Sequence, residues 1–221
     1  MSSILITGSN RGIGLELCKQ LSLKGNDVIA TCRNSSIDLD RLGVKVIENI
    51  DIRSSESIEE LKIQLNGIKL DCLINNAGIY EYNSLDKLDK SSIRNQFEVN
   101  ALSPLNLTNS LISFLKKDSK IAFITSRMGS IEDNTSGSSY GYRMSKVALS
   151  MAAKSLAIDL KSKEIFVAII HPGLVRTRMT GFSRNGITTE DSASGIIKRI
   201  NSLDKYNTGS FWHSNGKILP W

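Results

Sequence analysis

The chain has 221 residues, of which 40% are hydrophobic and 23% charged, so it is long enough to bury one sizeable core and has the balance of an ordinary globular protein. Its formal net charge of +6 is carried by scattered basic residues that acidic residues interrupt, which argues against a nucleic-acid-binding protein. No apolar run approaches the roughly 20 residues needed to cross a bilayer. We therefore expect one domain over residues 1–221, no nucleic-acid partner and no membrane span.

The sequence also shows neither a targeting signal nor a metal-binding pattern. The first apolar run begins at Ile4, which leaves no room for a secretory signal, so we expect a cytoplasmic protein. The three cysteines, Cys18, Cys32 and Cys72, are widely spaced and flanked by apolar residues. They predict free thiols, with neither a disulfide framework nor a metal site.

Short apolar segments alternate with longer segments of helical periodicity along the chain. The expected strands are Ile4–Thr7, Val28–Thr31, Val44–Ile47, Cys72–Asn75, Ile121–Thr125, Phe166–His171 and Gly209–Trp212. The expected helices are Gly12–Lys24, Ser54–Leu65, Ser91–Leu115, Tyr142–Lys161 and Glu190–Ser202. Because such alternation places helices on both faces of a parallel sheet, the predicted fold class is α/β, with a single doubly wound parallel sheet.

A glycine-rich loop, Thr7–Gly14, lies between the first expected strand and the first expected helix. In that context glycines allow a tight turn and bring a helix N-terminus up to a phosphate, although a glycine triplet alone is often an ordinary loop. The residues expected to bind the pyrophosphate of a dinucleotide are Gly8, Asn10, Arg11, Gly12, Ile13 and Gly14.

The end of the second strand, Thr31-Cys32-Arg33, indicates which dinucleotide is bound. Many NAD-binding folds carry a carboxylate there for the ribose hydroxyls, and this chain has none. Arg33, together with Arg11 in the glycine loop, offers guanidinium groups that suit a 2′-phosphate, so NADP(H) is expected as the cofactor. The alternative is that both arginines are solvated surface charges.

Two further segments follow the third and fourth strands. Asp51 could accept a hydrogen bond from an adenine amino group with Ile52 beside the ring, or it could be a helix cap or turn residue. Asn76, Ala77 and Gly78 are small enough to allow a close backbone approach to a cofactor, or they could form a simple turn.

The second half of the chain contains a candidate acid–base pair. Tyr142 and Lys146 lie one helical turn apart, so the ammonium can stabilise the ionised phenol. Ser126 ends an apolar strand at the sheet edge where ligands bind in such folds, and its hydroxyl could polarise a substrate oxygen; a turn serine is the alternative. Thr125 and Ser130 are weaker candidates for that role. The pattern predicts redox chemistry on a small carbonyl or alcohol substrate.

The order of these motifs resembles the short-chain dehydrogenase/reductase family along essentially the whole chain. The resemblance implies a Rossmann fold, a catalytic set of Ser126, Tyr142 and Lys146, and a role for Asn100 in holding a water of the proton relay. It also implies that Tyr142 and Lys146 contact the cofactor, together with Pro172, Gly173, Val175 and Thr177. Tyr140 offers a second phenol, but only Tyr142 has a lysine four residues later.

Three segments, Ile124–Ile131, Tyr140–Lys146 and Gly216–Trp221, resemble the branch of that family with Sniffer-type carbonyl reductases and C-factor proteins. The resemblance implies an NADPH-dependent reductase of small aldehydes, ketones or quinones, acting as a homodimer or homotetramer. The short stretch 178–189 suggests an open substrate site, or a plain loop. One alternative is a C-factor-like signalling protein. Another is a sugar-nucleotide epimerase or dehydratase, but such an enzyme usually needs a larger C-terminal substrate domain, and too few residues follow Thr177 to form one.

Overall fold

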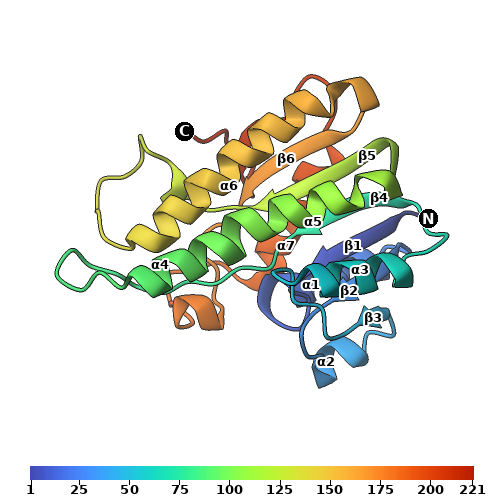
Figure 1. Ribbon diagram of the computed structural model, residues 1–221, viewed down its shortest axis with the longest axis horizontal. Coiled ribbons are helices and arrows are strands. Elements are labelled where there is room, and N and C mark those ends of the chain that lie inside the picture. The colour runs from blue at the N-terminus through green and yellow to red at the C-terminus, as the bar shows by residue number, and fades with distance from the viewer.

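The computed structural model describes residues 1–221. Seven strands form one parallel sheet in the order β3-β2-β1-β4-β5-β6-β7, with the order reversing between β1 and β4 (Figure 1). The strands are β1 Ser3–Thr7, β2 Asp27–Thr31, β3 Lys45–Ile47, β4 Leu70–Asn75, β5 Leu115–Ile124, β6 Phe166–His171 and β7 Phe211–His213. The predicted doubly wound α/β fold is confirmed.

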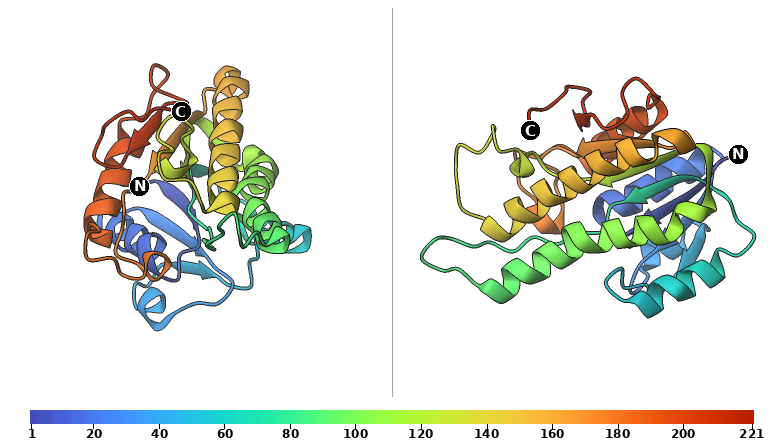
Figure 2. Two further views of the ribbon diagram at one scale, coloured as in Figure 1. Left: turned by 90° about the vertical axis from the view of Figure 1, so that its left-hand side faces the viewer. Right: turned by 45° about the horizontal axis from the view of Figure 1, so that its top comes forward.

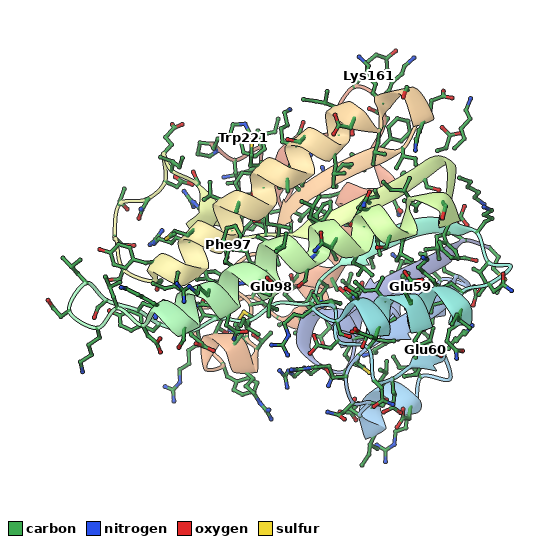
Figure 3. The ribbon with its side chains drawn as sticks, viewed as in Figure 1. Glu59, Glu60, Phe97, Glu98, Lys161 and Trp221 are labelled. Atoms are coloured by element: carbon green, nitrogen blue, oxygen red, sulfur yellow. The ribbon has the colours of Figure 1, made fainter.

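Helices cover both faces of the sheet (Figure 2). One face packs against α3 Ser55–Gln64, α5 Ser103–Leu111 and α6 Tyr140–Asp159, and α4 Lys90–Phe97 packs against α6. The other face packs against α1 Gly12–Leu23, α2 Ile37–Asp40 and α7 Thr189–Asn201. Each face has its own core, of 26 and 20 buried residues. Figure 3 shows Trp221 beside α6 and Lys161 beyond the end of that helix.

The strands supply both cores because successive side chains point to opposite faces of the sheet. In β1, Leu5 belongs to the core under α3, α5 and α6, whereas Ile4 and Ile6 belong to the core under α1 and α7. The register places Ile4 beside Val28 and Ile6 beside Ala30, which continues the apolar layer under α1 and α7 into β2. All five of these residues are less than 9% exposed, as expected for a sheet covered on both faces.

Most helix starts follow local capping chemistry. Ser54 caps α3, Asp89 caps α4 and Thr188 caps α7, each accepting hydrogen bonds from amides of the first turn through its side chain. Helix α1 differs, because Arg11 at its N-cap makes no side-chain hydrogen bond to the helix. The amides of its first turn are therefore available to another acceptor.

Three differences from the predicted elements matter. The helix expected over Ser91–Leu115 is divided by a π-helical segment, Glu98–Leu102, and α5 ends at Leu111. Strand β5 begins at Leu115 because Leu115 pairs with Leu70 across a shift in register. The short helix α2 was not predicted, since four residues are too few to show a helical period.

None of the helices combines the length and the apolar character needed to span a membrane. Cys18, Cys32 and Cys72 are buried and free, as the sequence predicted. Burial raises the pKa of the Cys72 thiol to about 12, so this side chain behaves as a small apolar core residue.

Candidate active site

The predicted acid–base pair lies at the start of α6, near the carboxyl ends of the central strands. Tyr142 and Lys146 are both buried, at 8% and 4% exposure. Ser126 directly follows β5 and is 7% exposed. Ligands of doubly wound sheets bind at this edge, where the strand order reverses. The three candidate catalytic residues are therefore on two neighbouring elements at the expected edge of the sheet.

Lys146 is tethered to the end of β5. Its Nζ donates a hydrogen bond to the carbonyl oxygen of Ile124 at 3.0 Å and lies 5.7 Å from the centroid of the Tyr142 ring. Burial lowers the pKa of Lys146 to about 8. The ammonium therefore has a fixed position beside the phenol, and it still carries its proton at neutral pH.

Tyr142 is a protonated phenol in this environment. Burial raises its pKa to about 12, an interaction with the Ser126 hydroxyl lowers it, and Tyr80 raises it further. Burial thus raises the pKa of this phenol, whereas the sequence led us to expect Lys146 to lower it. A phenol that keeps its proton at neutral pH is suited to donate that proton to a substrate oxygen.

The loop that carries Ser126 is pressed against α6. Ser126 accepts a hydrogen bond from the Met128 amide at 3.1 Å and so begins a short 3-10 turn, Arg127–Gly129. A Cβ at Gly129 would lie 2.7 Å from the carbonyl carbon of Lys146, so only glycine allows this approach. The close contact brings the Ser126 hydroxyl to the side of α6 that carries Tyr142.

The two weaker serine and threonine candidates have structural partners. The Thr125 hydroxyl bonds to the Lys146 carbonyl oxygen at 3.2 Å and to the Ser150 hydroxyl at 3.0 Å. Ser130 accepts a hydrogen bond from the Asp133 amide at 3.1 Å. Of the three hydroxyls, Ser126 is the one whose interaction with Tyr142 lowers the pKa of the phenol.

Asn100 lies fully buried in the π-helical segment between α4 and α5. Its Nδ2 donates to the Ile79 carbonyl oxygen at 2.9 Å and to the Ser145 hydroxyl at 3.0 Å, and its Oδ1 accepts from the Ile79 amide at 2.8 Å. A Cβ at Gly78 would lie 3.5 Å from Lys146 Nζ. Asn100 thus joins the segment after β4 to α6, close to Lys146. The π-helical segment that carries Asn100 is of a kind frequently found at functional sites.

The glycine-rich loop packs tightly against the end of β4. Gly8 and Gly12 have positive φ of 68° and 56°, which favours glycine. A Cβ at Gly8 would lie 2.8 Å from Ala77 Cα, and one at Gly14 would lie 2.6 Å from Asn76 Nδ2. Ile13 follows Gly12 in the first turn of α1. These glycines bring the uncapped N-terminus of α1 to the same sheet edge as Lys146.

Asn76 and Asn10 hold the glycine loop in place. Asn76 Nδ2 donates to the carbonyl oxygens of Thr7 at 2.9 Å and Gly8 at 3.1 Å. The Thr7 hydroxyl accepts hydrogen bonds from the amides of Asn76 and Ala77, both at 3.1 Å. Asn10 Nδ2 donates to the Asn34 carbonyl oxygen at 2.9 Å. The side chains of both asparagines therefore support the loop backbone.

Arg11 at the N-cap of α1 and Arg33 after β2 are exposed, and neither is paired with a carboxylate. Asp51, by contrast, is held by Arg53, whose Nη2 lies 2.6 Å from Asp51 Oδ2 and whose Nε lies 3.1 Å from Oδ1. This guanidinium lowers the pKa of the carboxyl. Sequence reasoning missed Arg53, although a basic residue two positions after Asp51 was the available signal. Ile52 is buried at 8% exposure.

The segment after β6 reaches the glycine loop. Pro172 accepts hydrogen bonds from the Ser192 and Ser214 hydroxyls at 2.8 and 3.0 Å. Gly173 has a positive φ of 92°, and Val175 is buried at 2% exposure. A Cβ at Gly12 would lie 3.5 Å from the Thr177 methyl group. Thr177 is therefore brought against the glycine loop.

One aromatic neighbour of the site was not predicted. The Tyr80 ring stands edge-on to Tyr142, with centroids 5.0 Å apart and planes at 87°. The Tyr80 hydroxyl bonds to Ser139 Oγ at 3.1 Å. An aromatic residue two positions after Gly78 was the signal that could have suggested this contact.

The residues fit a dinucleotide. The uncapped first turn of α1 and the glycines that bring it to the sheet edge suit a pyrophosphate, and Arg11 and Arg33 suit an additional phosphate.

Comparison with known proteins gives the family: the model of the short chain dehydrogenase family matches residues 2–187. The chain belongs to the short-chain dehydrogenase family.

Two relatives extend this result. A 1-hydroxy-2-glutathionyl-2-methyl-3-butene dehydrogenase from Rhodococcus sp. (strain AD45) is 38% identical over 226 aligned positions, with all of both chains covered. The C-signal protein of Myxococcus xanthus is 37% identical over 155 positions, which cover 69% of this chain and 93% of that protein.

Solved structures agree in fold. An NADPH-bound carbonyl reductase from chicken fatty liver superposes with a TM-score of 0.91 at 28% identity, covering 100% of this chain and 99% of that one. The carbonyl reductase Sniffer of D. melanogaster superposes with a TM-score of 0.91 at 29% identity, with both chains fully covered. The predicted resemblance to this branch of the family is confirmed.

Proposed function

We propose that this short-chain dehydrogenase is an NADPH-dependent reductase of the carbonyl group in small aldehydes, ketones or quinones. The observation that carries the proposal is the buried pair of Tyr142 and Lys146, with Ser126 beside it. The uncapped start of α1 at the same sheet edge supplies the dinucleotide site. We assign catalysis to Ser126, Tyr142, Lys146 and Asn100.

NADP(H) is the cofactor that this chain suits. The end of β2 offers Arg33 and no carboxylate, and Arg11 provides a second unpaired guanidinium. Guanidinium groups bind phosphate through two parallel hydrogen bonds, so they favour a 2′-phosphate over free ribose hydroxyls. The NADPH in the chicken carbonyl reductase supports the same choice.

The protein's own groups supply the proton and the electrostatic support. NADPH, when bound, supplies the hydride that the carbonyl carbon accepts. Tyr142 donates its phenolic proton to the carbonyl oxygen, and the Ser126 hydroxyl donates a hydrogen bond to that oxygen as negative charge develops there. The Lys146 ammonium stabilises the phenolate left behind, and Asn100 holds a water through which the phenol regains its proton.

The segment beyond Thr177 supports an open substrate site. It is short and braced, because Arg176 Nε donates to the Gly186 carbonyl oxygen at 2.6 Å and Nη2 donates to that of Arg184 at 3.1 Å. The Ile187 amide also bonds to the Leu174 carbonyl oxygen at 2.8 Å. We infer that so short a segment leaves the site open to carbonyl compounds of several shapes. The Rhodococcus relative is named for a glutathionyl alcohol, which is a substrate worth including in an assay.

A second candidate function is a C-factor-like signalling protein, in which dinucleotide binding matters more than turnover. The similarity to C-signal favours it. The buried Tyr142–Lys146 pair argues for catalysis, because binding alone requires no proton donor. Tight NADPH binding with no turnover of any carbonyl substrate would favour the signalling function.

We further propose that residues 1–221 form a single domain and that the protein acts in the cytoplasm as a homodimer or homotetramer. The single sheet to which the whole chain contributes supports the first proposal. Exposed apolar residues on the outer face of α6, namely Met144, Met151 and Ile158, support self-association. Light scattering of the purified protein tests the oligomeric state.

The function is tested by assaying a panel of aldehydes, ketones, quinones and a glutathionyl alcohol with NADPH and NADH, or with NADP and NAD for the alcohol. For a substrate that turns over, NADPH deuterated at the transferred position should place deuterium on the product carbon. We expect faster turnover with NADPH than with NADH. Turnover without transfer of the label, or none with any panel member, would contradict the proposal.

A further inference from the structure

The first turn of α6, which carries Tyr142, is held from outside by two buried amide side chains. Asn83 lies in the loop between β4 and α4, and Gln96 lies near the end of α4. They are 3% and 0% exposed. We call these two side chains the amide clamp. Figures 1 and 2 show α4 and α6 running side by side from the same end of the molecule.

Asn83 supplies the capping interactions that α6 lacks. Ser139, the residue before the helix, makes no side-chain hydrogen bond to the first turn. The Asn83 carbonyl oxygen accepts from the Ser139 amide at 2.6 Å, and Asn83 Oδ1 accepts from the Gly141 amide at 3.4 Å. Because helix-start amides have no partner within the helix, these contacts fix where α6 begins.

Gln96 fixes the orientation of Asn83. Its Nε2 donates to Asn83 Oδ1 at 3.3 Å and to the Glu81 carbonyl oxygen at 3.1 Å, while its Oε1 accepts from the Glu81 amide at 3.0 Å. A Cβ at Gly141 would lie 2.7 Å from Gln96 Nε2. The clamp therefore touches the backbone of α6 one residue before Tyr142.

The turn that enters α6 is strained. Ser138 and Ser139 both have positive φ, 54° and 50°, in the left-handed region that serine seldom adopts. Such conformations persist where the surrounding contacts determine them, and they cluster at functional sites. Ser139 bonds to the backbone carbonyl oxygen of Asn83 and to the Tyr80 hydroxyl, and the Ser138 carbonyl oxygen accepts from Arg143 Nε at 3.0 Å. The clamp adds the contact with the Gly141 amide, and Gln96 anchors the loop that carries the Asn83 carbonyl oxygen through Glu81. Loss of the clamp therefore removes contacts that hold the strained turn and the helix start in place.

We propose that Asn83 and Gln96 are positioning residues that hold Tyr142 in the orientation needed for proton transfer. The inference rests on the proposed role of Tyr142 as proton donor. Neither side chain is required to touch substrate or cofactor. Because a displacement of about 1 Å at a reacting group can cost on the order of 100-fold in rate, a relaxed helix start lowers turnover without loss of the fold.

The chemistry of Asn83 allows a rescue experiment. In Asn83→Ala the acceptor for the Gly141 amide and for Gln96 is lost. In Asn83→Asp both hydrogen bonds remain, and the Ser92 hydroxyl, which now accepts from Asn83 Nδ2 at 3.4 Å, can instead donate to the second oxygen. We expect Asn83→Ala to lower kcat at least ten-fold with unchanged affinity for NADPH, and Asn83→Asp to recover most of the rate.

Hydrogen–deuterium exchange gives a readout that does not depend on activity. Amides of the first turn of α6 should exchange at least ten-fold faster in Asn83→Ala than in the unchanged protein or Asn83→Asp. Gln96→Met keeps the length of the side chain but removes its hydrogen bonds, so it should act like Asn83→Ala. It replaces Asn83→Ala in both measurements if that variant does not fold. Arg94→Ala, an exposed change on α4, is the matched control and should leave rate and exchange unaltered.

The clamp would be contradicted by a normal kcat and normal exchange in Asn83→Ala or Gln96→Met, or by an Asn83→Asp variant as impaired as Asn83→Ala. Failure of the proposed function gives a different result from either of these, because it would appear in the unchanged protein. If the unchanged protein reduces no carbonyl substrate, the exchange rates of the three variants alone decide whether the clamp holds the helix start.

Discussion

The ammonium nitrogen of Lys146 lies 5.7 Å from the centre of the Tyr142 ring, and burial raises the pKa of the phenol to about 12 while lowering that of the lysine to about 8. At neutral pH both groups therefore keep their protons. The pair can release one proton from the phenol and leave the resulting phenolate beside a cation. This arrangement suits carbonyl reduction, in which the substrate oxygen takes up a proton.

The first prediction concerns the pH dependence of reduction. Because the pKa of Lys146 is about 8, this side chain loses its positive charge as the pH rises above that value. A neutral lysine no longer stabilises the phenolate, so kcat for carbonyl reduction should be level near pH 7 and fall above about pH 8. A kcat that stays level to pH 10 would contradict the role of the ammonium.

The second prediction concerns stability. The pKa of Lys146 is lower in the folded protein than its ordinary value of 10.5, so the unfolded chain binds more protons between these values and burial of this residue costs less as the pH rises. Relative to Lys146→Met, the unchanged protein should gain on the order of 2 kcal/mol in unfolding free energy from pH 8 to 10. Urea denaturation at several pH values measures this difference, and a constant difference would refute the prediction.

The third prediction concerns cofactor choice. Arg33→Ala removes a guanidinium from the end of β2, where a 2′-phosphate is expected. The preference for NADPH over NADH, measured as the ratio of the kcat/KM values, should fall by about ten-fold or more, since a charge-assisted hydrogen bond contributes about 1.5–3 kcal/mol. Arg41→Ala, which changes another exposed arginine nearby, should leave the ratio unaltered. Equal effects of the two substitutions would argue against a specific phosphate contact.

The fourth prediction concerns the contact between the Ser126 loop and α6. Gly129→Ala places a methyl group 2.7 Å from the Lys146 carbonyl carbon, so the loop must move. We expect a loss of about 1–3 kcal/mol in stability, as for other overpacked sites, together with a lower kcat. Gly137→Asn is the control, because nothing lies within 4 Å of that position and asparagine tolerates its positive φ. Unchanged kinetics and melting temperature in Gly129→Ala would show that the contact is dispensable.

The fold was largely predictable because its strands and helices differ strongly in hydrophobic period. The positions of all seven strands follow from short apolar runs, and the glycine loop follows from its place between β1 and α1. The start of β5 was not predictable, because the charged residues Lys116, Lys117 and Asp118 separate Leu115 from the apolar run that begins at Ile121. Leu115 joins the sheet by pairing with Leu70 of β4, which is a tertiary contact.

The site was predictable only in part. The spacing of Tyr142 and Lys146 indicated a shared helix face, but it could not indicate burial, which decides the direction of both pKa shifts. The π-helical segment around Asn100 and the Arg53–Asp51 ion pair depend on packing between elements. Asn83 and Gln96 carry no sequence signal at all, because their role arises from the approach of α4 to α6.

The central claim is that Tyr142 gives its proton to a substrate carbonyl oxygen. Its most direct test compares Tyr142→Phe with the unchanged protein in NADPH-dependent reduction of a reactive aldehyde or quinone, with NADPH affinity measured for both. We predict unchanged NADPH affinity and a loss of at least about 100-fold in kcat, as expected on removal of a general acid. Turnover by Tyr142→Phe at the rate of the unchanged protein would contradict the account.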